Sequence, residues 1–404
     1  MLQLPSINAV QRLAVKLQPK AEKFVKQGHP WIFEDRIAKQ NTEGNSGDIA
    51  VIFSQKNNKV LGVGLWDAES PIRIKLLHNA AAQINVHFFK DRIERAFEKR
   101  KTLLATNTNS YRLIFGENDG FPSLIADVYN QVLVVKLYAT IWLSYFEMIL
   151  PILIEISKAK TAVLRLSRNV AKALKETNIK DGTVVYGSLI NENVVFVEHG
   201  IQFSANVIKG HKTGYFLDHR ANRKRLGELA KGKKVLDVFS YAGGFSVHAL
   251  VGGATEVISL DISAQALEQA VKNGKLNSYK GTHKTMAIDA FVGLQNLIAK
   301  NEQFDIVIID PPSFAKSAIE VSGAINSYSR LAKLGIQLVK KGGVLVLASC
   351  SSRVLAEEFF EISEAAMEKS KYSFKVIDKT YHDSDHPITF PEGAYLKCGY
   401  YRIN

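Results

Sequence analysis

Cysteine is scarce in this sequence, with only Cys350 and Cys398 among 404 residues. Two thiols in one chain can build neither a disulfide framework nor a zinc site of four thiolates. A signal-peptide pattern is also missing from the start of the sequence. Together these absences predict a protein of the reducing cytoplasm.

A metal site is not expected either. The run from His382 to His386 holds metal-binding residue types four positions apart, but Pro387 and turn-forming residues interrupt the helix that this spacing requires. A zinc site also needs about four ligands of fixed geometry. We therefore predict no metal, and a solvated loop in this stretch.

Long uninterrupted apolar runs are missing as well. The stretch Val132–Ile156 is apolar but is broken by Lys136, Glu147, Pro151 and Glu155, whereas a bilayer span needs about 20 predominantly apolar residues. The stretch is typical of a strand followed by a core helix, so no membrane association is expected.

Acidic residues are outnumbered by basic ones. The chain has 52 Lys and Arg against 39 Asp and Glu, which gives a formal charge of +13, and this excess favours polyanionic partners such as nucleic acid. The excess is spread as +4, +3 and +6 over residues 1–78, 79–199 and 200–404. Because no basic tail carries it, an anion-binding surface has to be assembled from folded domains.

Those three ranges are the predicted domains, because the pattern of apolar runs and turn residues changes between them. Residues 1–78 hold short β-like runs between turn-rich stretches and predict a β-rich domain. Residues 79–199 open with a helix over about 85–104 and continue with strands, which is typical of a small α+β domain. Residues 200–404 alternate strands and helices, the pattern of a doubly wound parallel sheet. Its predicted strands are Val235–Phe239, Glu256–Asp261, Lys284–Asp289, Phe304–Asp310 and Gly343–Ser349, with helices near 244–250, 264–276, 290–299, 325–340 and 354–368.

The dinucleotide fingerprint G-x-G-x-x-G is also absent, which argues against an NAD-linked oxidoreductase. The loop after the first strand of the parallel sheet reads D-V-F-S-Y-A-G-G-F instead. Acidic residues mark four strands at the edge where open α/β sheets bind ligands, namely Asp237, Asp261, Asp289 and Asp310. Helix capping is the plainer explanation of such residues. Four at equivalent points favour S-adenosylmethionine, with Asp261 on the ribose hydroxyls and Asp289 on the adenine amino group.

The fourth strand of this sheet runs into I-I-D-P-P-S-F at residues 308–314. Pro311 and Pro312 fix the backbone after Asp310, and Phe314 is suited to stack on a planar base. The sequence therefore predicts that this loop binds a nucleobase.

The fifth strand ends in V-L-V-L-A-S-C-S-S, which puts Cys350 at the same edge of the sheet. A lone cysteine is most often a small buried hydrophobe, but a place between two serines at this edge favours a nucleophile. Carbon-5 of cytosine is too weakly nucleophilic to take a methyl group unaided, and a thiolate that adds to carbon-6 activates it. Asp310 would then hydrogen-bond or protonate ring nitrogen-3.

These motifs resemble those of class I methyltransferases that act on nucleobases, with D-P-P-S-F as motif IV and V-L-D-V-F-S-Y-A-G-G-F-S-V-H-A-L as motif I. From end to end the chain resembles the ribosomal large subunit methyltransferase I family, which methylates carbon-5 of cytosine in large-subunit ribosomal RNA. The similar segments are GHPWIF, GENDGFPSLIADVY, KTGYFLDHRANR, DPPSF, SCSS and PEGAYLKCGYYRI. The resemblance implies an N-terminal PUA domain, a small α+β domain and a Rossmann-like methyltransferase domain, often as a dimer.

The resemblance also implies roles for individual residues. Cys350 matches the nucleophile and Asp310 the motif IV acid. Where related RNA cytosine methyltransferases carry a second cysteine in motif IV, this chain has Pro312 and Ser313, so the base that releases the product is not identified. Cys398 is interpreted as structural. The implied donor pocket consists of Phe216, Asp218, Asp237, Ser240, Tyr241, Gly243, Asp261, Ser263, Asp289 and Asp310, and the implied base-binding residues are Pro311, Pro312 and Phe314.

Two other functions remain compatible with these residues. A D-P-P-F type motif can orient a base nitrogen for methylation without any thiol, which would make Cys350 a bystander. An RNA-binding ribosome assembly factor with a decayed donor pocket is the second alternative. The target nucleotide and the state of the RNA substrate cannot be read from the motifs.

Overall fold

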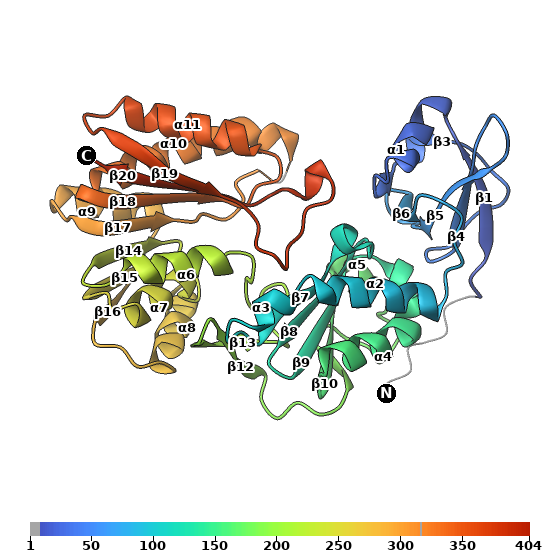
Figure 1. The fold of residues 1–404 in the computed structure, drawn as a ribbon, viewed down its shortest axis with the longest axis horizontal. Helices are drawn as coiled ribbons and strands as arrows, with labels where there is room; N and C mark the ends of the chain where they lie inside the picture. Colours follow the sequence, from blue (N-terminus) through green and yellow to red (C-terminus); the bar gives the residue numbers. More distant parts are fainter. Residues whose placement is uncertain (1–8, 316) are drawn as a thin grey trace. The chain divides into compact units, whose positions relative to one another are not determined.

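The structure is a computed structural model that describes residues 9–315 and 317–404 (Figure 1). The described residues form two compact units. Unit 1 contains the chain up to Val197, together with Ser204–Leu217 and Ser384–Phe390. Unit 2 contains Glu198–Phe203, Asp218–Asp383 and Pro391–Asn404. Two short segments from the second half of the sequence therefore belong to the fold of the first half.

The N-terminal part of unit 1 is a six-stranded sheet in the order β2-β6-β5-β4-β1-β3. Gly62 and Gly64 let β5 and β6 approach closely, because a Cβ at Gly64 would lie 2.6 Å from the backbone oxygen of Lys75. The predicted β-rich character is confirmed. The elements are β1 (Arg12–Leu17), α1 (Glu22–Lys26), β2 (Trp31–Ile32), β3 (Ile37–Gln40), β4 (Ile49–Phe53), β5 (Val60–Trp66) and β6 (Ile74–His78).

The rest of unit 1 is built on a five-stranded sheet in the order β11-β10-β9-β8-β7. The helix predicted over 85–104 is divided in two at Lys99 and Arg100. The Arg100 side chain is fully buried and donates to the backbone oxygen of Arg112 and to the carboxylate of Asp119, so the chain turns where this side chain enters the core. The elements are α2 (Val86–Glu98), α3 (Lys101–Leu104), β7 (Ser110–Phe115), β8 (Leu124–Tyr129), β9 (Val132–Leu137), α4 (Phe146–Ser157), β10 (Thr161–Leu166), α5 (Arg168–Ala173) and β11 (Thr183–Tyr186).

The apolar stretch of unit 1 forms a strand followed by a helix, as predicted. Within the described residues, Thr140–Ser157 is the one helical segment long and apolar enough to cross a membrane by length and composition, and 56% of it is buried. Trp142 and Phe146 from this segment pack in the core of unit 1 with Phe89. The expectation that the protein is not membrane-bound stays a prediction.

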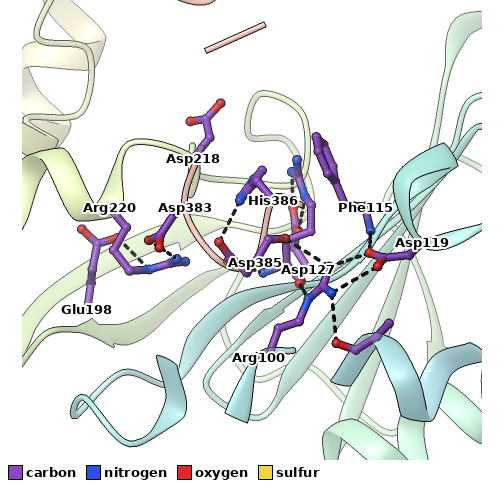
Figure 2. A network of polar contacts seen from close by, with 12 residues as sticks. Arg100, Phe115, Asp119, Asp127, Glu198, Asp218, Arg220, Asp383, Asp385 and His386 are labelled. Carbon is purple, nitrogen blue, oxygen red and sulfur yellow. Dashed lines mark hydrogen bonds and ion pairs between the residues drawn. The ribbon is translucent and has the colours of Figure 1, made fainter. Parts of the chain in front are cut away.

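The loop at 382–386 is not solvated throughout, so that prediction was wrong. Asp385 and His386 are fully buried in unit 1. The Asp385 carboxylate accepts the backbone N–H of Arg112 at 2.9 Å. It also contacts His386 Nδ1 at 2.8 Å, as Figure 2 shows. The backbone oxygen of Asp385 also accepts from Arg100 at 3.1 Å. The polar composition of this segment predicted that it is exposed to solvent. It is buried because Arg100 and the backbone N–H of Arg112 donate hydrogen bonds to Asp385.

The C-terminal sheet has seven strands in the order β16-β15-β14-β17-β18-β20-β19. Its first five strands are parallel, and β20 and β19 pair antiparallel at one edge. The strands are β14 (Lys234–Val238), β15 (Glu256–Asp261), β16 (Thr282–Ala287), β17 (Phe304–Ile309), β18 (Val339–Ser349), β19 (Phe374–Thr380) and β20 (Lys397–Ile403). The helices are α6 (Arg220–Leu229), α7 (Gly244–Val251), α8 (Ala264–Lys275), α9 (Ala290–Ala299), α10 (Val321–Gln337) and α11 (Ala356–Glu368), and a separate two-stranded sheet joins β12 (Asn193–Glu198) to β13 (Ile201–Asn206).

Both faces of this sheet are buried, which explains why its central strands are almost wholly apolar. Successive residues of a strand point to opposite faces. Leu236 and Val238 of β14 accordingly belong to one buried cluster, and Val235 belongs to another. The helices that connect the parallel strands along the chain cover the sheet, as in Figure 1.

The predicted fold class is confirmed: a β-rich N-terminal domain is followed by mixed α/β structure and a doubly wound parallel sheet. All five predicted strands of that sheet and all five predicted helices are present, with ends shifted by a few residues. The division at residues 78 and 199 stays a prediction.

Replacing Asp385 with Ala should lower the free energy of unfolding by about 2–3 kcal/mol, because the buried Arg112 N–H loses its acceptor. Urea denaturation measures the change. Asp35→Ala is the control, since Asp35 is exposed and pairs only with its neighbour Arg36 among the described residues. Equal stability of the two variants would show that the buried segment contributes nothing.

Candidate functional site

The candidate site lies at the point where the order of the parallel strands reverses. The chain runs outward from β14 through β15 to β16 and then returns to β17, on the other side of β14. Ligands of open α/β sheets bind at such a point, outside the carboxyl ends of the strands. Asp237, Asp261, Asp310 and Cys350 all lie at this edge.

The D-P-P-S-F loop directly follows β17. The backbone N–H of Asp310 donates to the oxygen of Val238 at 3.3 Å, which continues the pairing of β17 with β14. Phe314 packs edge-to-face with Tyr328 at 5.2 Å between ring centroids, and lies 6.5 Å from Phe239. Phe314 is therefore held by other rings, and its stacking on a base stays a prediction. Pro312 is exposed, whereas Pro311 is buried.

Cys350 directly follows β18 and lies against this loop. Its Sγ is 3.8 Å from the backbone oxygen of Pro311, to which the thiol donates. The flanking Ser349 and Ser351 are fully buried, and Ser349 Oγ donates to the Tyr328 hydroxyl at 2.9 Å. The structure thus brings Cys350 next to the segment that carries Asp310.

Lys397 from β20 holds the turn after Cys350. Its buried ammonium group donates to the backbone oxygens of Ser351, Val354 and Tyr395. Burial lowers the pKa of Lys397 to about 8, so most of this side chain is still charged at pH 7 and donates all three of its protons. Sequence reasoning missed this residue, although its place beside Cys398 on the strand paired with β18 was a signal that could have found it.

The thiol of Cys350 is protonated at neutral pH. Burial raises the pKa of Cys350 to about 12, and the Asp310 and Asp218 carboxylates add to this, while Lys397 acts in the opposite direction. A thiolate is the nucleophilic form of cysteine, so the site as it stands suppresses that form.

The glycine-containing loop after β14 has a strained backbone. Phe239, Tyr241 and Gly243 all have positive φ, at 63°, 47° and 76°. A Cβ at Gly243 would lie 2.6 Å from Cβ of Ala270, so α7 and α8 approach closely only because this residue is glycine. The backbone N–H of Tyr241 donates to Asp261 at 2.9 Å, which ties the loop to the end of β15.

Three of the predicted residues accept hydrogen bonds from backbone N–H groups at this edge of the sheet. Asp261 also accepts the N–H of Ser263 at 2.8 Å, and Ser263 Oγ caps α8. Asp289 caps α9 by accepting from Phe291 and Val292 through Oδ1. Helix capping, the plainer explanation considered for these acids, therefore occurs at Asp289, and its contact with adenine stays a prediction.

Asp237 is buried at the end of a chain of hydroxyl groups. Its Oδ2 accepts from Ser246 Oγ at 2.6 Å, Ser246 Oγ is 2.6 Å from Ser259 Oγ, and Ser259 Oγ is 2.7 Å from His283 Nε2. Burial raises the pKa of Asp237 to about 7, and Asp310 and Asp261 contribute further, against hydrogen bonds from Ser246. Asp237 Oδ1 and Ser240 Oγ are buried without a hydrogen-bond partner among the described residues.

Asp218 and Phe216 belong to different units. Asp218, in unit 2, accepts from the Tyr395 hydroxyl at 2.9 Å. Phe216 belongs to unit 1, and its side chain is 40% exposed. The contact of both residues with a donor stays a prediction.

A buried charge cluster in unit 2 fixes α6, the helix that follows Asp218. Glu198 accepts from Arg223 through both oxygens at 2.7 Å and contacts His248 at 2.9 Å. Burial raises the pKa of Glu198, but the Arg223 guanidinium outweighs it and holds that pKa well below its usual range. Arg220 pairs with Asp383 at 3.2 Å, as drawn in Figure 2. Because its acids and bases pair with one another, a structural role is the sufficient explanation of this cluster.

Metal ligation is not suggested by the side chains. Within residues 9–315 and 317–404, no three His, Cys, Asp or Glu residues are grouped so that they could hold a metal ion. The expectation that the protein carries no metal stays a prediction.

Comparison with known proteins decides the family. A family model described as S-adenosylmethionine-dependent methyltransferase matches residues 112–400, and a PUA-like domain model matches residues 15–79. The chain belongs to the S-adenosylmethionine-dependent methyltransferase family. Its N-terminal domain is PUA-like, as the sequence predicted.

Curated relatives of this methyltransferase match over almost their whole length. A ribosomal RNA large subunit methyltransferase of Deinococcus radiodurans is 39% identical over 98% of this chain and 99% of the relative. Ribosomal RNA large subunit methyltransferase I of Tolumonas auensis is 34% identical over 95% of this chain and 97% of the relative. The predicted resemblance to that family is confirmed.

Solved structures share the fold. A putative methyltransferase structure from Streptococcus mutans matches with a TM-score of 0.81 and 22% identity, over 96% of this chain and 99% of that one. A second solved structure, of SMU.776 complexed with SAH, matches with the same TM-score and identity over 97% and 100%. At this identity the likeness shows the fold alone.

The cofactor of the family, S-adenosylmethionine, suits the residues present. The donor carries positive charge on its sulfonium and ammonium groups, and buried acids with a free oxygen can offset such charge. Asp237 Oδ1 is a buried carboxylate oxygen of this kind. The methyltransferase therefore groups acidic residues where a bound cation would offset the free-energy cost of burying them.

Asp237→Asn should change how stability depends on pH. The folded wild type holds a proton on Asp237 from about pH 4 to pH 7 that the unfolded chain lacks, so this group makes the free energy of unfolding fall as pH rises through that window. The stability of the Asn variant relative to the wild type should increase by about 2 kcal/mol between pH 5 and pH 7. Denaturation of both proteins at each pH tests this, and parallel pH curves would contradict it.

Cys350 should react slowly with iodoacetamide in the donor-free protein. With its pKa near 12, alkylation at pH 8 should be at least about a hundredfold slower than that of a free cysteine, and the rate should still rise at pH 10. Mass spectrometry of the labelled peptide measures the rate, with Cys350→Ser as the control. A rate that levels off below pH 9 would show that the thiol has an ordinary or lowered pKa.

Proposed function

We propose that this protein transfers a methyl group from S-adenosylmethionine to carbon-5 of a cytosine in large-subunit ribosomal RNA. The observation that carries the proposal is the approach of Cys350 to the D-P-P-S-F loop, with Sγ 3.8 Å from the oxygen of Pro311. This contact puts a thiol beside an acid at the ligand-binding edge of a methyltransferase sheet. The names of the relatives support large-subunit ribosomal RNA as the substrate.

The chemistry needs a nucleophile because carbon-5 of cytosine does not attack a methyl group unaided. The Cys350 thiolate adds to carbon-6, and the electron pair of the ring double bond becomes available at carbon-5. S-adenosylmethionine supplies an electrophilic methyl group on a sulfonium. Transfer of the methyl group to carbon-5 would break its bond to the donor sulfur and release S-adenosylhomocysteine. Carbon-5 would then give its proton to a base that is not identified, the bond between the Cys350 sulfur and carbon-6 would break, and the thiolate would be regenerated.

We assign to Asp310 the binding of the cytosine ring. A carboxyl group at this place would hydrogen-bond ring nitrogen-3 and stabilise the charge that develops when the thiolate adds. Asp310 also raises the pKa of the Cys350 thiol, after burial itself. The same carboxylate that assists the adduct thus opposes thiolate formation until positive charge enters the site.

We assign RNA binding to the PUA-like domain and to the excess of basic residues. The formal charge of +13 would attract a polyanion, with an affinity that falls as the salt concentration rises. A cytoplasmic location is expected from the scarcity of cysteine and the missing signal-peptide pattern. Dimerisation is expected from the resemblance.

One observation favours a second function. Because the Cys350 pKa is raised to about 12, a methyltransferase that acts on a base nitrogen without a thiol is the alternative. The D-P-P-S-F loop would orient the nitrogen, and Cys350 would be a structural residue.

Cys350→Ala should reduce formation of 5-methylcytosine by at least about a thousandfold, because the covalent step is lost. The assay uses large-subunit ribosomal RNA from cells that lack this protein, followed by mass spectrometry of the nucleosides. Cys398→Ala is the matched control, because Cys398 is fully buried in β20 and bonded within the sheet.

The outcome separates the candidate functions. Loss of 5-methylcytosine only in the Cys350 variant supports the proposal. Full activity of that variant would refute the covalent mechanism, and a base methylated on nitrogen would establish the alternative. An unchanged methylation profile of ribosomal RNA in cells without the protein would refute the proposed substrate.

A further inference from the structure

His219 lies beside Asp310, the acid to which we assign the binding of the cytosine ring. The sequence motifs did not identify His219 as a site residue. It stands between Asp218 and the start of α6, and only 5% of it is exposed. Its Nε2 is 3.3 Å from Oδ1 of Asp310, which is an ion-pair distance, but the geometry at this nitrogen does not meet that of a hydrogen bond. The ring also packs against Phe245, with 5.5 Å between the ring centroids.

The other ring nitrogen of His219, Nδ1, contacts the side-chain amide of Asn222. Asn222 Nδ2 is 3.2 Å from Nδ1 of His219. Asn222 Oδ1 accepts from Thr380 Oγ1 at 2.7 Å and from the Tyr400 hydroxyl at 3.0 Å. Because two hydroxyl donors meet the amide oxygen, the NH₂ group is the part of the amide that faces His219.

This arrangement selects one tautomer of the neutral ring. An amide NH₂ donates only, so Nδ1 must accept, and the ring proton then sits on Nε2. Nε2 is the nitrogen that faces Asp310. Asn222 thus aims the donor of His219 at the carboxylate, through hydroxyl groups from β19 and β20.

We propose that His219 is a positioning residue that pairs through Nε2 with Oδ1 of Asp310 and leaves Oδ2 for the cytosine base. The inference rests on the proposed function, because it assigns Asp310 to that base. It also names Asn222 as the residue that sets the tautomer of His219.

Electrostatics around the ring agree with this pairing. Burial lowers the pKa of His219, but the Asp310 carboxylate, by charge and hydrogen bonding, and then Asp218 outweigh burial and the opposing Arg223, so the pKa is raised. The neutral ring with its proton on Nε2 and the protonated ring both carry a proton on the nitrogen that faces Asp310. Only the neutral ring also lets Nδ1 accept from Asn222.

Two substitutions separate positioning from a structural role. In His219→Gln an amide can still donate to Asp310, whereas His219→Leu has a similar size and no donor. We expect kcat to stay within about tenfold of wild type for Gln and to fall about a hundredfold for Leu. The Kd for S-adenosylmethionine, measured by calorimetry, should change less than threefold in both. Equal losses of kcat in the two variants, or a loss that appears only as weaker donor binding, would overturn the proposal.

His248→Leu is the matched control, because His248 is an equally buried histidine of unit 2 that contacts Glu198 instead of Asp310. This variant should unfold at a lower temperature while its kcat stays within about threefold of wild type. A hundredfold loss of kcat in the control would show that any buried histidine has this effect, and would overturn the assignment to His219.

The tautomer is testable without any assay of activity. In protein labelled with ¹⁵N-histidine, long-range proton–nitrogen spectra distinguish a ring protonated at Nε2 from one protonated at Nδ1. The His219 signal is assigned by its loss in His219→Gln. We expect protonation at Nε2, and Nδ1–H with a bare Nε2 would overturn the proposal even if every variant were inactive. If the wild type makes no 5-methylcytosine, the proposed function fails, while this spectrum still decides whether His219 carries its proton on the nitrogen that faces Asp310.

Discussion

The parallel pairing of β14, β17 and β18 is the constraint on which the candidate site depends. Three neighbouring strands that run in the same direction end at the same edge, so the residues after them are close without any further device. The register pairs Val238 with Ile309 and Ile309 with Leu347. Asp310 and Cys350, which directly follow β17 and β18, are brought together for that reason. Core packing on both faces of the sheet fixes the strands and therefore the site.

The electrostatics of this edge follow from burial of like charges. Asp237, Asp310 and Asp218 lie in one unit, and the pKa values of Asp237 and Cys350 are raised by burial first and by neighbouring carboxylates second. A folded protein gains nothing from such an arrangement by itself. It becomes intelligible when the ligand is a cation, since positive charge stabilises the ionised forms of the same groups. The cost in stability and the suitability for a sulfonium donor have the same origin.

Several features of the fold could be predicted because they depend on local pattern. The strands of the parallel sheet are short apolar runs that end at acids, and the helices between them show the expected spacing. The break at Arg100 and the burial of Asp385 and His386 could not be predicted. Each depends on buried hydrogen bonds to other elements, such as the bond between Arg100 and Asp385, 285 positions apart. Composition alone indicates exposure for such polar residues.

The amino-acid sequence by itself determined the fold class, the family and the candidates Cys350 and Asp310, because strand ends and the D-P-P-S-F and S-C-S motifs are local signals. Only the tertiary structure decided which polar groups surround them. Lys397 reaches the turn after Cys350 from β20, and His219 reaches Asp310 from the start of α6, with Asn222 held by side chains of β19 and β20. These partners come from separate elements, and hydrogen-bond geometry between distant elements exists only once the chain has folded.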